Sequence, residues 1–216
     1  MKNSRPGTAA IVPAYNENAR IGHVIETLVA CPDLDEIIVV DDGSIESLAW
    51  IKAQFPTVEL IRHPTNRGKA AALESGVEAT ECELLFFCDA DLVGLRPEHV
   101  TELIKPVASG TYMMSVGLRS NLAQRVVFLF ALNSGERCIR KSDWLSLPVF
   151  YKKGFRIETG LNIMAWRQGG KIFHHQFPYR QTLRESKYGF FKGMHGRMRL
   201  CRDVFSAWIY ALINSR

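Results

Sequence analysis

The chain has 216 residues, of which 47% are hydrophobic, and a formal net charge of +5 at pH 7. This length predicts one domain with a core large enough to fold without disulfide bonds. The five cysteines are odd in number and show no CxxC spacing, which indicates reduced thiols in a cytoplasmic protein. The longest apolar runs are too short for a membrane-spanning helix, which needs about 20 residues.

The charge is divided unevenly along the chain. Residues 1–151 hold 14 basic and 19 acidic side chains, a net charge of −5, whereas residues 152–216 hold 13 basic and 3 acidic ones, a net charge of +10. This asymmetry predicts an anionic partner for the C-terminal third, such as phosphate groups, an anionic membrane surface or nucleic acid. The alternative is a basic face that is only solvated.

Short apolar runs alternate with helical patterns in the first half of the chain. We predict strands at 9–13, 36–42, 58–62 and 83–89, separated by helices at 20–30, 46–54, 68–79 and 97–109. This alternation is typical of βαβ units, so it predicts an α/β fold whose mostly parallel sheet is covered on both faces. Further along the chain we predict a strand at 112–118, helices at 122–132 and 158–168, a strand at 171–177 and an amphipathic helix from 190 to 213.

Carboxylates follow three of the predicted strands at the point where each strand ends. They are Glu17 in PAYNE, Asp41 and Asp42 in DDGS, and Asp89 and Asp91 in DADL. Because ligands bind beyond the carboxyl ends of parallel strands, we expect these groups to gather at one edge. Some of them have an alternative role as helix caps or turn residues. A hard cation such as Mg²⁺ or Mn²⁺ would relieve their mutual repulsion and would share its coordination with substrate phosphates.

Four motifs occur in an ordered series: VPAYNE (12–17), IIVVDDGS (37–44), NRGKAAAL (66–73) and DADL (89–92). In this order and spacing they resemble a family 2 glycosyltransferase of the GT-A fold, in which DADL is the DxD motif. The resemblance implies a three-layer, Rossmann-like sandwich with a C-terminal helical tail. We expect a single domain over 1–216, with a nucleotide-sugar-binding half at 8–120 and an acceptor-side half at 121–216.

The resemblance also implies roles for particular residues. Catalysis is assigned to Asp91 and Glu158, and the metal, Mg²⁺ or Mn²⁺, to Asp91, Asp89 and His175. The nucleoside-diphosphate sugar, linked to uridine or guanosine diphosphate, is expected to bind Pro13, Tyr15, Glu17, Asp42, Gly68, Lys69, Asp89 and Ala90. Carboxylates would accept hydrogen bonds from the base and ribose, Gly68 would let backbone approach the ligand, and Lys69 would supply a positive charge.

The acceptor side of the chain matches two groups of relatives more loosely. ETGLN (158–162) and FPYRQTLRESKYG (177–189) are similar to enzymes that glycosylate polyprenyl phosphates, whereas DADLVGLRPEHV (89–100) is similar to relatives of glucosyl-3-phosphoglycerate synthase. We expect Arg184 and Lys187 to bind acceptor phosphate. The candidate partners are a polyprenyl phosphate, an anionic membrane surface at the cytoplasmic face and a second copy of the chain. A nucleic acid is not expected, because no binding module is recognised.

The sequence departs from the family pattern at two points. Val93 stands where polyprenyl-phosphate transferases often carry a polar residue, so a third metal ligand would come from His174, His175 or Gln181. The Glu-Asp pair that supplies a general base to hydroxyl acceptors is absent from 134–144, which leaves Glu136, Asp143 and Glu158 as single candidates. An anionic acceptor needs no base, so these features favour a phosphorylated one.

Other classes of protein fit the sequence less well. A nucleotidyltransferase would need a basic, glycine-rich loop after the first strand, and a phosphoacceptor signalling domain would be shorter. A dinucleotide oxidoreductase would show GxGxxG after a strand. A sugar-nucleotide-binding protein without catalytic turnover stays open.

Overall fold

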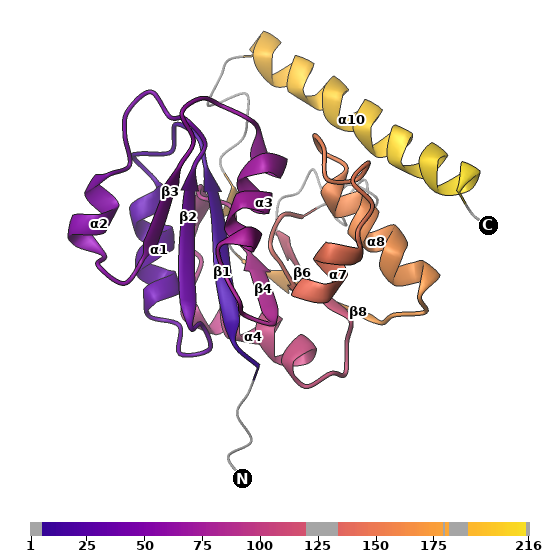
Figure 1. Cartoon of the computed structure of the whole chain (residues 1–216), viewed down its shortest axis with the longest axis horizontal. Helices are drawn as coiled ribbons and strands as arrows, with labels where there is room; N and C mark the ends of the chain where they lie inside the picture. Colours follow the sequence, from indigo (N-terminus) through magenta and orange to yellow (C-terminus); the bar gives the residue numbers. More distant parts are fainter. Residues whose placement is uncertain (1–5, 120–133, 179, 182–189, 215–216) are drawn as a thin grey trace.

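The computed structural model describes residues 6–119, 134–178, 180–181 and 190–214. Its centre is a seven-stranded sheet with helices on both faces (Figure 1). The strand order is β3-β2-β1-β4-β7-β6-β8, and β7 alone runs antiparallel to its neighbours. The strands are β1 (Thr8–Ala14), β2 (Glu36–Asp41), β3 (Glu59–Arg62), β4 (Leu84–Phe87), β6 (Met114–Arg119), β7 (Arg137–Arg140) and β8 (Ile172–Phe177).

The first three strands and β4 confirm the parallel α/β prediction. Strands β1, β2 and β4 are buried along nearly their whole length, as expected for strands covered on both faces. Between them the chain forms α1 (Ile21–Val29), α2 (Trp50–Gln54), α3 (Lys69–Glu78) and α4 (Pro97–Ala108). The second of these helices is shorter than the predicted 46–54, because the chain leaves DDGS through an irregular segment.

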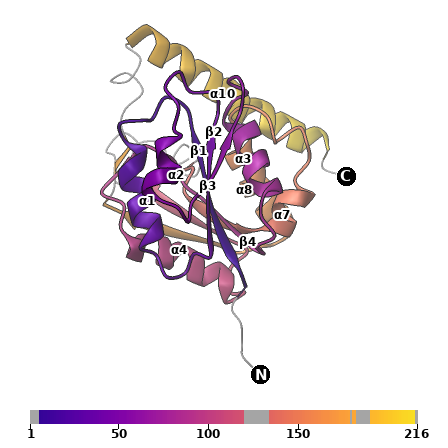
Figure 2. The same cartoon turned by 60° about the vertical axis from the view of Figure 1, so that its left-hand side comes forward.

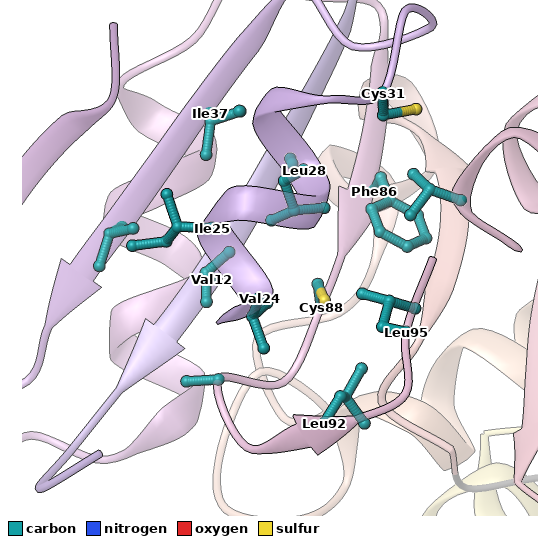
Figure 3. Close-up of a cluster of buried hydrophobic side chains, with 14 of the residues drawn as sticks. Val12, Val24, Ile25, Leu28, Cys31, Ile37, Phe86, Cys88, Leu92 and Leu95 are labelled. Carbon is teal, nitrogen blue, oxygen red and sulfur yellow. The ribbon is translucent and has the colours of Figure 1, made fainter. Parts of the chain in front are cut away.

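One hydrophobic cluster fills the space between the sheet and helices α1 and α4. Helix α1 buries Ile21, Val24, Ile25 and Leu28, a spacing that forms one face of a helix. These side chains pack against Val12 and Phe86 of the sheet (Figure 3). Helix α4 begins at Pro97, whose fixed φ suits a first helical turn, and adds Val100, Leu103, Ile104 and Val107.

The opposite face of the sheet is covered by α3, α7 (Lys141–Ser146) and α8 (Ile157–Arg167). Long helix α10 (Phe190–Ile213) lies outside this layer and contacts α8 (Figures 1 and 2). Its Ala207 and Ala211 are buried, and the ring of Tyr210 stacks on Phe150 with 4.1 Å between centroids. The predictions for 158–168, 171–177 and 190–213 are therefore confirmed, whereas the predicted helix at 122–132 lies outside the described residues.

Two strand pairings were not predicted. Strand β7 inserts between β4 and β6, with Arg137 opposite Phe87 and Arg140 opposite Leu84. A second sheet pairs β5 (Leu92–Val93) with β9 (Arg180–Gln181), which brings the backbone of residue 181 beside the residue that follows Asp91. Both pairings join segments that are far apart in sequence, so local periodicity gives no sign of them.

Every helix in the described ranges is too short or too polar to cross a bilayer. The five cysteines are free thiols, and all but Cys201 are buried.

Candidate functional site

The carboxyl ends of β1, β2 and β4 meet at one edge of the sheet, as parallel pairing requires. The antiparallel strand β7 begins at this same edge, because Arg137 lies opposite Phe87 at the end of β4. The edge therefore collects the three predicted carboxylate segments and the turn at 134–136. We refer to this region as the candidate site.

Lys69 lies at the centre of the candidate site. Its Nζ is 2.8 Å from Oδ1 of Asp89 and 3.2 Å from Oε1 of Glu158, so one ammonium group joins the end of β4 to the first turn of α8. Burial alone would lower the pKa of Lys69, but the charges of Asp89 and Glu158 outweigh it and raise that pKa above its ordinary value. Lys69 is therefore a fixed cation at neutral pH.

The loop before Lys69 is held by Asp42. The Asp42 carboxylate accepts hydrogen bonds from the backbone N–H groups of Arg67 at 2.9 Å and Gly68 at 2.7 Å. Its Oδ1 also lies 2.7 Å from Nδ1 of His63, and Asp42 is only 2% exposed. Gly68 has φ of 92°, a conformation that favours glycine, and places Lys69 at the start of α3. The aspartate predicted to contact the nucleotide thus also positions the lysine loop.

The VPAYNE motif (12–17) lies at the candidate site next to the end of β2. Asn16 adopts φ of 56°, its N–H donates to Oγ of Ser44 at 2.9 Å, and its Oδ1 accepts from the N–H of Ile45. These bonds join PAYNE to DDGS. Tyr15 is 38% exposed, Pro13 is half-buried, and Glu17 is nearly buried with its carboxylate 2.9 Å from Arg20.

The two aspartates of DADL differ in their surroundings. Asp89 is paired with Lys69, whereas the buried Asp91 is 4% exposed and directly precedes strand β5; Ala90 between them is also buried. Carboxylate oxygens suit Mg²⁺ or Mn²⁺. Within the described ranges, no group of three or more His, Cys, Asp or Glu side chains is arranged to hold a metal ion. The chemistry of the donor set fits a cation that takes its other ligands from a diphosphate and water.

The predicted histidine ligands lie on β8. His175 is 3.5 Å from a carboxylate oxygen of Glu102 on α4 and stacks on Phe177, so its observed partners are not the DADL aspartates. Burial, with the charge of Arg137 as a second cause, lowers the pKa of His174. Arg184 and Lys187, the predicted acceptor residues, lie outside the described residues, as does the side chain of Gln181.

The turn at 134–137 brings to the candidate site Gly135 and Arg137, which the sequence pattern did not indicate. A Cβ added at Gly135 would lie 2.8 Å from Nζ of Lys69 and 2.9 Å from both carboxylate oxygens of Asp89. Ser134 donates to the fully buried carboxylate of Glu136 at 2.8 Å. Asp143, in contrast, lies on α7 beyond the far end of β7, away from the candidate site. The sequence signal for this turn is a glycine directly before a Glu-Arg pair, of which Glu136 alone is named above as a candidate base.

The comparisons with known proteins agree with this geometry. The family model described as glycosyl transferase family 2 matches residues 9–126, more than half of the chain. A dolichyl-phosphate beta-glucosyltransferase of Trichomonas vaginalis is 34% identical over 132 residues, which are 53% of this chain and 39% of the relative. A glucosyl-3-phosphoglycerate synthase of Mycobacterium tuberculosis is 31% identical over 111 residues, 47% of this chain and 34% of that protein. The chain thus aligns with less than half the length of either relative.

A solved structure extends the similarity of the fold. The crystal structure of the Mycobacterium tuberculosis glucosyl-3-phosphoglycerate synthase in complex with Mn²⁺, uridine diphosphate and phosphoglyceric acid has a TM-score of 0.77 to this chain. The match covers 95% of this chain and 78% of that one at 23% identity. The predicted GT-A fold is confirmed by this likeness.

Proposed function

Because the chain belongs to glycosyl transferase family 2, we propose that it moves a glycosyl group from a nucleoside diphosphate sugar to a phosphorylated acceptor. One observation supports this proposal above the others: the Asp-Ala-Asp segment after β4, in which Asp91 is buried and Asp89 is half-buried, lies against a lysine that is held between two carboxylates. Such an arrangement suits a ligand that carries a diphosphate together with a dication.

Different residues of the candidate site would bind different parts of the donor. Tyr15 and Glu17 would contact the base and ribose, and Asp42 would do so through any lone pairs that the loop leaves available. Gly68 and Lys69 would meet the diphosphate at the start of α3, where backbone N–H groups and the helix dipole also favour an anion. Lys69 keeps its proton at neutral pH, so its role is electrostatic and not that of a base.

We propose Asp89 and Asp91 as the protein ligands of Mg²⁺ or Mn²⁺. Bound there, the cation would act as a Lewis acid that offsets the charge developing on the departing nucleoside diphosphate. Glu158, nearly buried and held by Lys69, would orient the transferred sugar by accepting hydrogen bonds from its hydroxyl groups. His175 is a weaker proposal as a third ligand, since it is paired with Glu102.

An anionic acceptor is supported by the charge of the C-terminal third, with Arg184 and Lys187 proposed as its phosphate-binding residues. The outer face of α10 supports a lipid-linked acceptor. Met198, Phe205, Leu212 and Ile213 are each more than two-thirds exposed, whereas the buried residues between 198 and 213 are Asp203, Ala207 and Ala211. We propose that this face rests on an anionic membrane surface, which exposed Arg199 and Arg202 would favour.

A ligand panel with and without Mn²⁺ tests the proposed function. The chain is melted with uridine and guanosine diphosphates and their sugar conjugates, and each stabilising conjugate is then assayed for sugar transfer to a polyprenyl phosphate and to a small phosphorylated acceptor. A ligand at 100 times its dissociation constant adds about 2.7 kcal/mol to the free energy of unfolding. Binding without transfer to either acceptor would indicate a sugar-nucleotide-binding protein, and no metal-dependent stabilisation by any nucleotide would overturn the proposal.

A further inference from the structure

The guanidinium of Arg137 is buried beneath the candidate site. Arg137 is 1% exposed and is the first residue of β7, in register with Phe87, two residues before Asp89. Its surroundings include the apolar side chains of Met114 and Phe87. Burial lowers the pKa of Arg137 to about 10, although the charges of Glu158, Glu136 and Asp89 oppose that shift. A cation in this position is costly, and an apolar side chain of similar volume would often be as stable.

The hydrogen bonds of Arg137 join the two segments that flank Lys69. Its Nη2 and Nε donate to the carbonyl of Ser134 at 2.6 and 3.2 Å. Its Nη1 lies 3.3 Å from the carbonyl of Glu158 and 3.4 Å from Oδ1 of Asn162, both on α8. One guanidinium therefore ties the turn at 134–136 to the first turn of α8.

Both of these segments touch the central lysine. Gly135 follows Ser134, and the space where its side chain would be is filled by Lys69 and Asp89. Glu158 holds Nζ of Lys69 from the other side. A shift of either segment would change the position of Nζ between its two carboxylates, and Arg137 bonds to both segments.

Arg137 also changes the charge of the site. Asp89, Glu136 and Glu158 are three acidic groups whose charges act on both Lys69 and Arg137, so each of the two cations offsets part of their negative charge. Because a diphosphate is itself anionic, each uncompensated carboxylate would weaken its binding.

We propose that Arg137 is a positioning residue that sets Lys69 for the donor diphosphate, through the Ser134 and Glu158 carbonyls and through its charge. The proposal rests on the proposed function, since it requires that a nucleoside diphosphate binds at Lys69. Arg140 is a matched control on the same strand, because it also donates to a backbone carbonyl, that of Val107, but lies at the opposite edge of the sheet.

A double-mutant cycle on ligand affinity tests the proposal. The dissociation constant of uridine diphosphate with Mn²⁺ is measured by calorimetry for wild type, Arg137→Met, Lys69→Met and the double variant. We expect Arg137→Met to weaken binding about tenfold in the wild-type background and about threefold when Lys69 is already replaced, because the positioning effect is lost with the lysine and only the charge of the arginine still acts on the diphosphate. Arg137→Lys, which keeps the charge, should recover part of the loss, and Arg140→Met should bind as wild type does.

The outcomes separate this inference from the proposed function. Equal losses from Arg137→Met in the two backgrounds would show that Arg137 does not position Lys69. Unchanged affinity in a variant that still unfolds cooperatively would show that Arg137 has a structural role only. A wild-type chain that binds neither uridine nor guanosine diphosphate would overturn the proposed function first, and the role of Arg137 with it. If Arg137→Met does not fold, the comparison of Arg137→Lys with wild type in the two lysine backgrounds decides the question in the same way.

Discussion

Lys69 and Asp89, twenty residues apart in the sequence, form an ion pair with 2.8 Å between Nζ and Oδ1. The loop held by Asp42 supplies the lysine, and the end of β4 supplies the aspartate. The ammonium group of Lys69 therefore compensates one of the two closely spaced carboxylates that follow the buried strand β4. The ion pair also places the lysine beside the segment to which we assign the cation and the diphosphate.

The pH dependence of stability follows from this ion pair. The pKa of Lys69 is raised in the folded state. The contribution of its charge to the free energy of unfolding is therefore fully present below the ordinary lysine pKa of 10.5, and it is lost only as pH rises past the raised value. Lys69→Met should therefore lower the free energy of unfolding by about 1 kcal/mol, a small figure because the side chain is partly exposed. Urea unfolding at pH 7, 8 and 9 should give the same difference from wild type at each pH. A difference that shrinks over this range would contradict the assignment, and the exposed Lys52→Met serves as control.

Removal of the DADL carboxylates should abolish transfer and spare the fold. Asp91→Ala and Asp89→Ala each remove a proposed metal ligand, so we expect the stabilisation by uridine diphosphate that requires Mn²⁺ to fall by about 2 kcal/mol. The measurement is thermal melting with nucleotide, with and without a chelator. Asp143→Ala is the matched control, because this carboxylate lies on α7 away from the site. Full metal-dependent stabilisation in the Asp89, Asp91 double variant would reject these ligands.

Gly135→Ala should impair the site with little effect on stability. The added methyl group would meet Nζ of Lys69 and both oxygens of Asp89 within 3 Å, so these side-chain ends must move apart. We expect transfer to fall at least about tenfold, since small displacements of positioning groups have large effects. Gly22→Ala is the control, because its Cβ would contact only Trp50, at 3.5 Å. Alanine in place of glycine in helix α1 should raise the free energy of unfolding by about 0.5–1 kcal/mol. Normal transfer by Gly135→Ala would show that the site has room there.

Asp42→Asn should lower both nucleotide affinity and stability. The carboxylate accepts from the N–H groups of Arg67 and Gly68 on different oxygens, and an amide can offer an oxygen to only one of them. The unsatisfied N–H should cost about 1–3 kcal/mol. Chemical denaturation gives the stability, and calorimetry with uridine and guanosine diphosphates gives the affinity. Asp35→Asn, on the loop before β2, is a control for loss of one carboxylate charge. If stability stays at the wild-type value, Asp42 does not hold the lysine loop.

The outer face of α10 should bind anionic vesicles in a salt-sensitive manner. Sedimentation with phosphatidylserine-containing liposomes should capture the wild-type chain at low salt and release it at high salt, because arginines near the surface contribute about 1 kcal/mol each. Phe205→Ser with Leu212→Ser should reduce capture, and both side chains are exposed, so the fold should persist. Val29→Ser, on α1, should leave capture unchanged. Absence of binding at low salt would favour a small, water-soluble acceptor over a lipid-linked one.

The sequence alone predicted the strands and helices whose apolar periodicity is local. Alternating buried strands and amphipathic helices up to Ala108 were predicted from apolar periodicity, because a parallel sheet covered on both faces needs continuous apolar runs. The resemblance of four ordered motifs identified the DADL segment and Lys69, since these residues stand at fixed places beside strands. The amphipathic helix at 190–213 was also predicted from its helical spacing, although the face that it turns to solvent was not.

Only the tertiary structure decided how the site is assembled. Strand β7 and the turn before it depend on pairing with β4, more than forty residues earlier, and no local pattern records such a pairing. For the same reason the sequence did not reveal that Gly135 makes space for Lys69 and Asp89, or that Arg137 joins Ser134 to Glu158. The orientation of α10 follows from side-chain size: Ala207 and Ala211 allow close contact with the neighbouring layer, and Met198, Phe205 and Leu212 are left exposed.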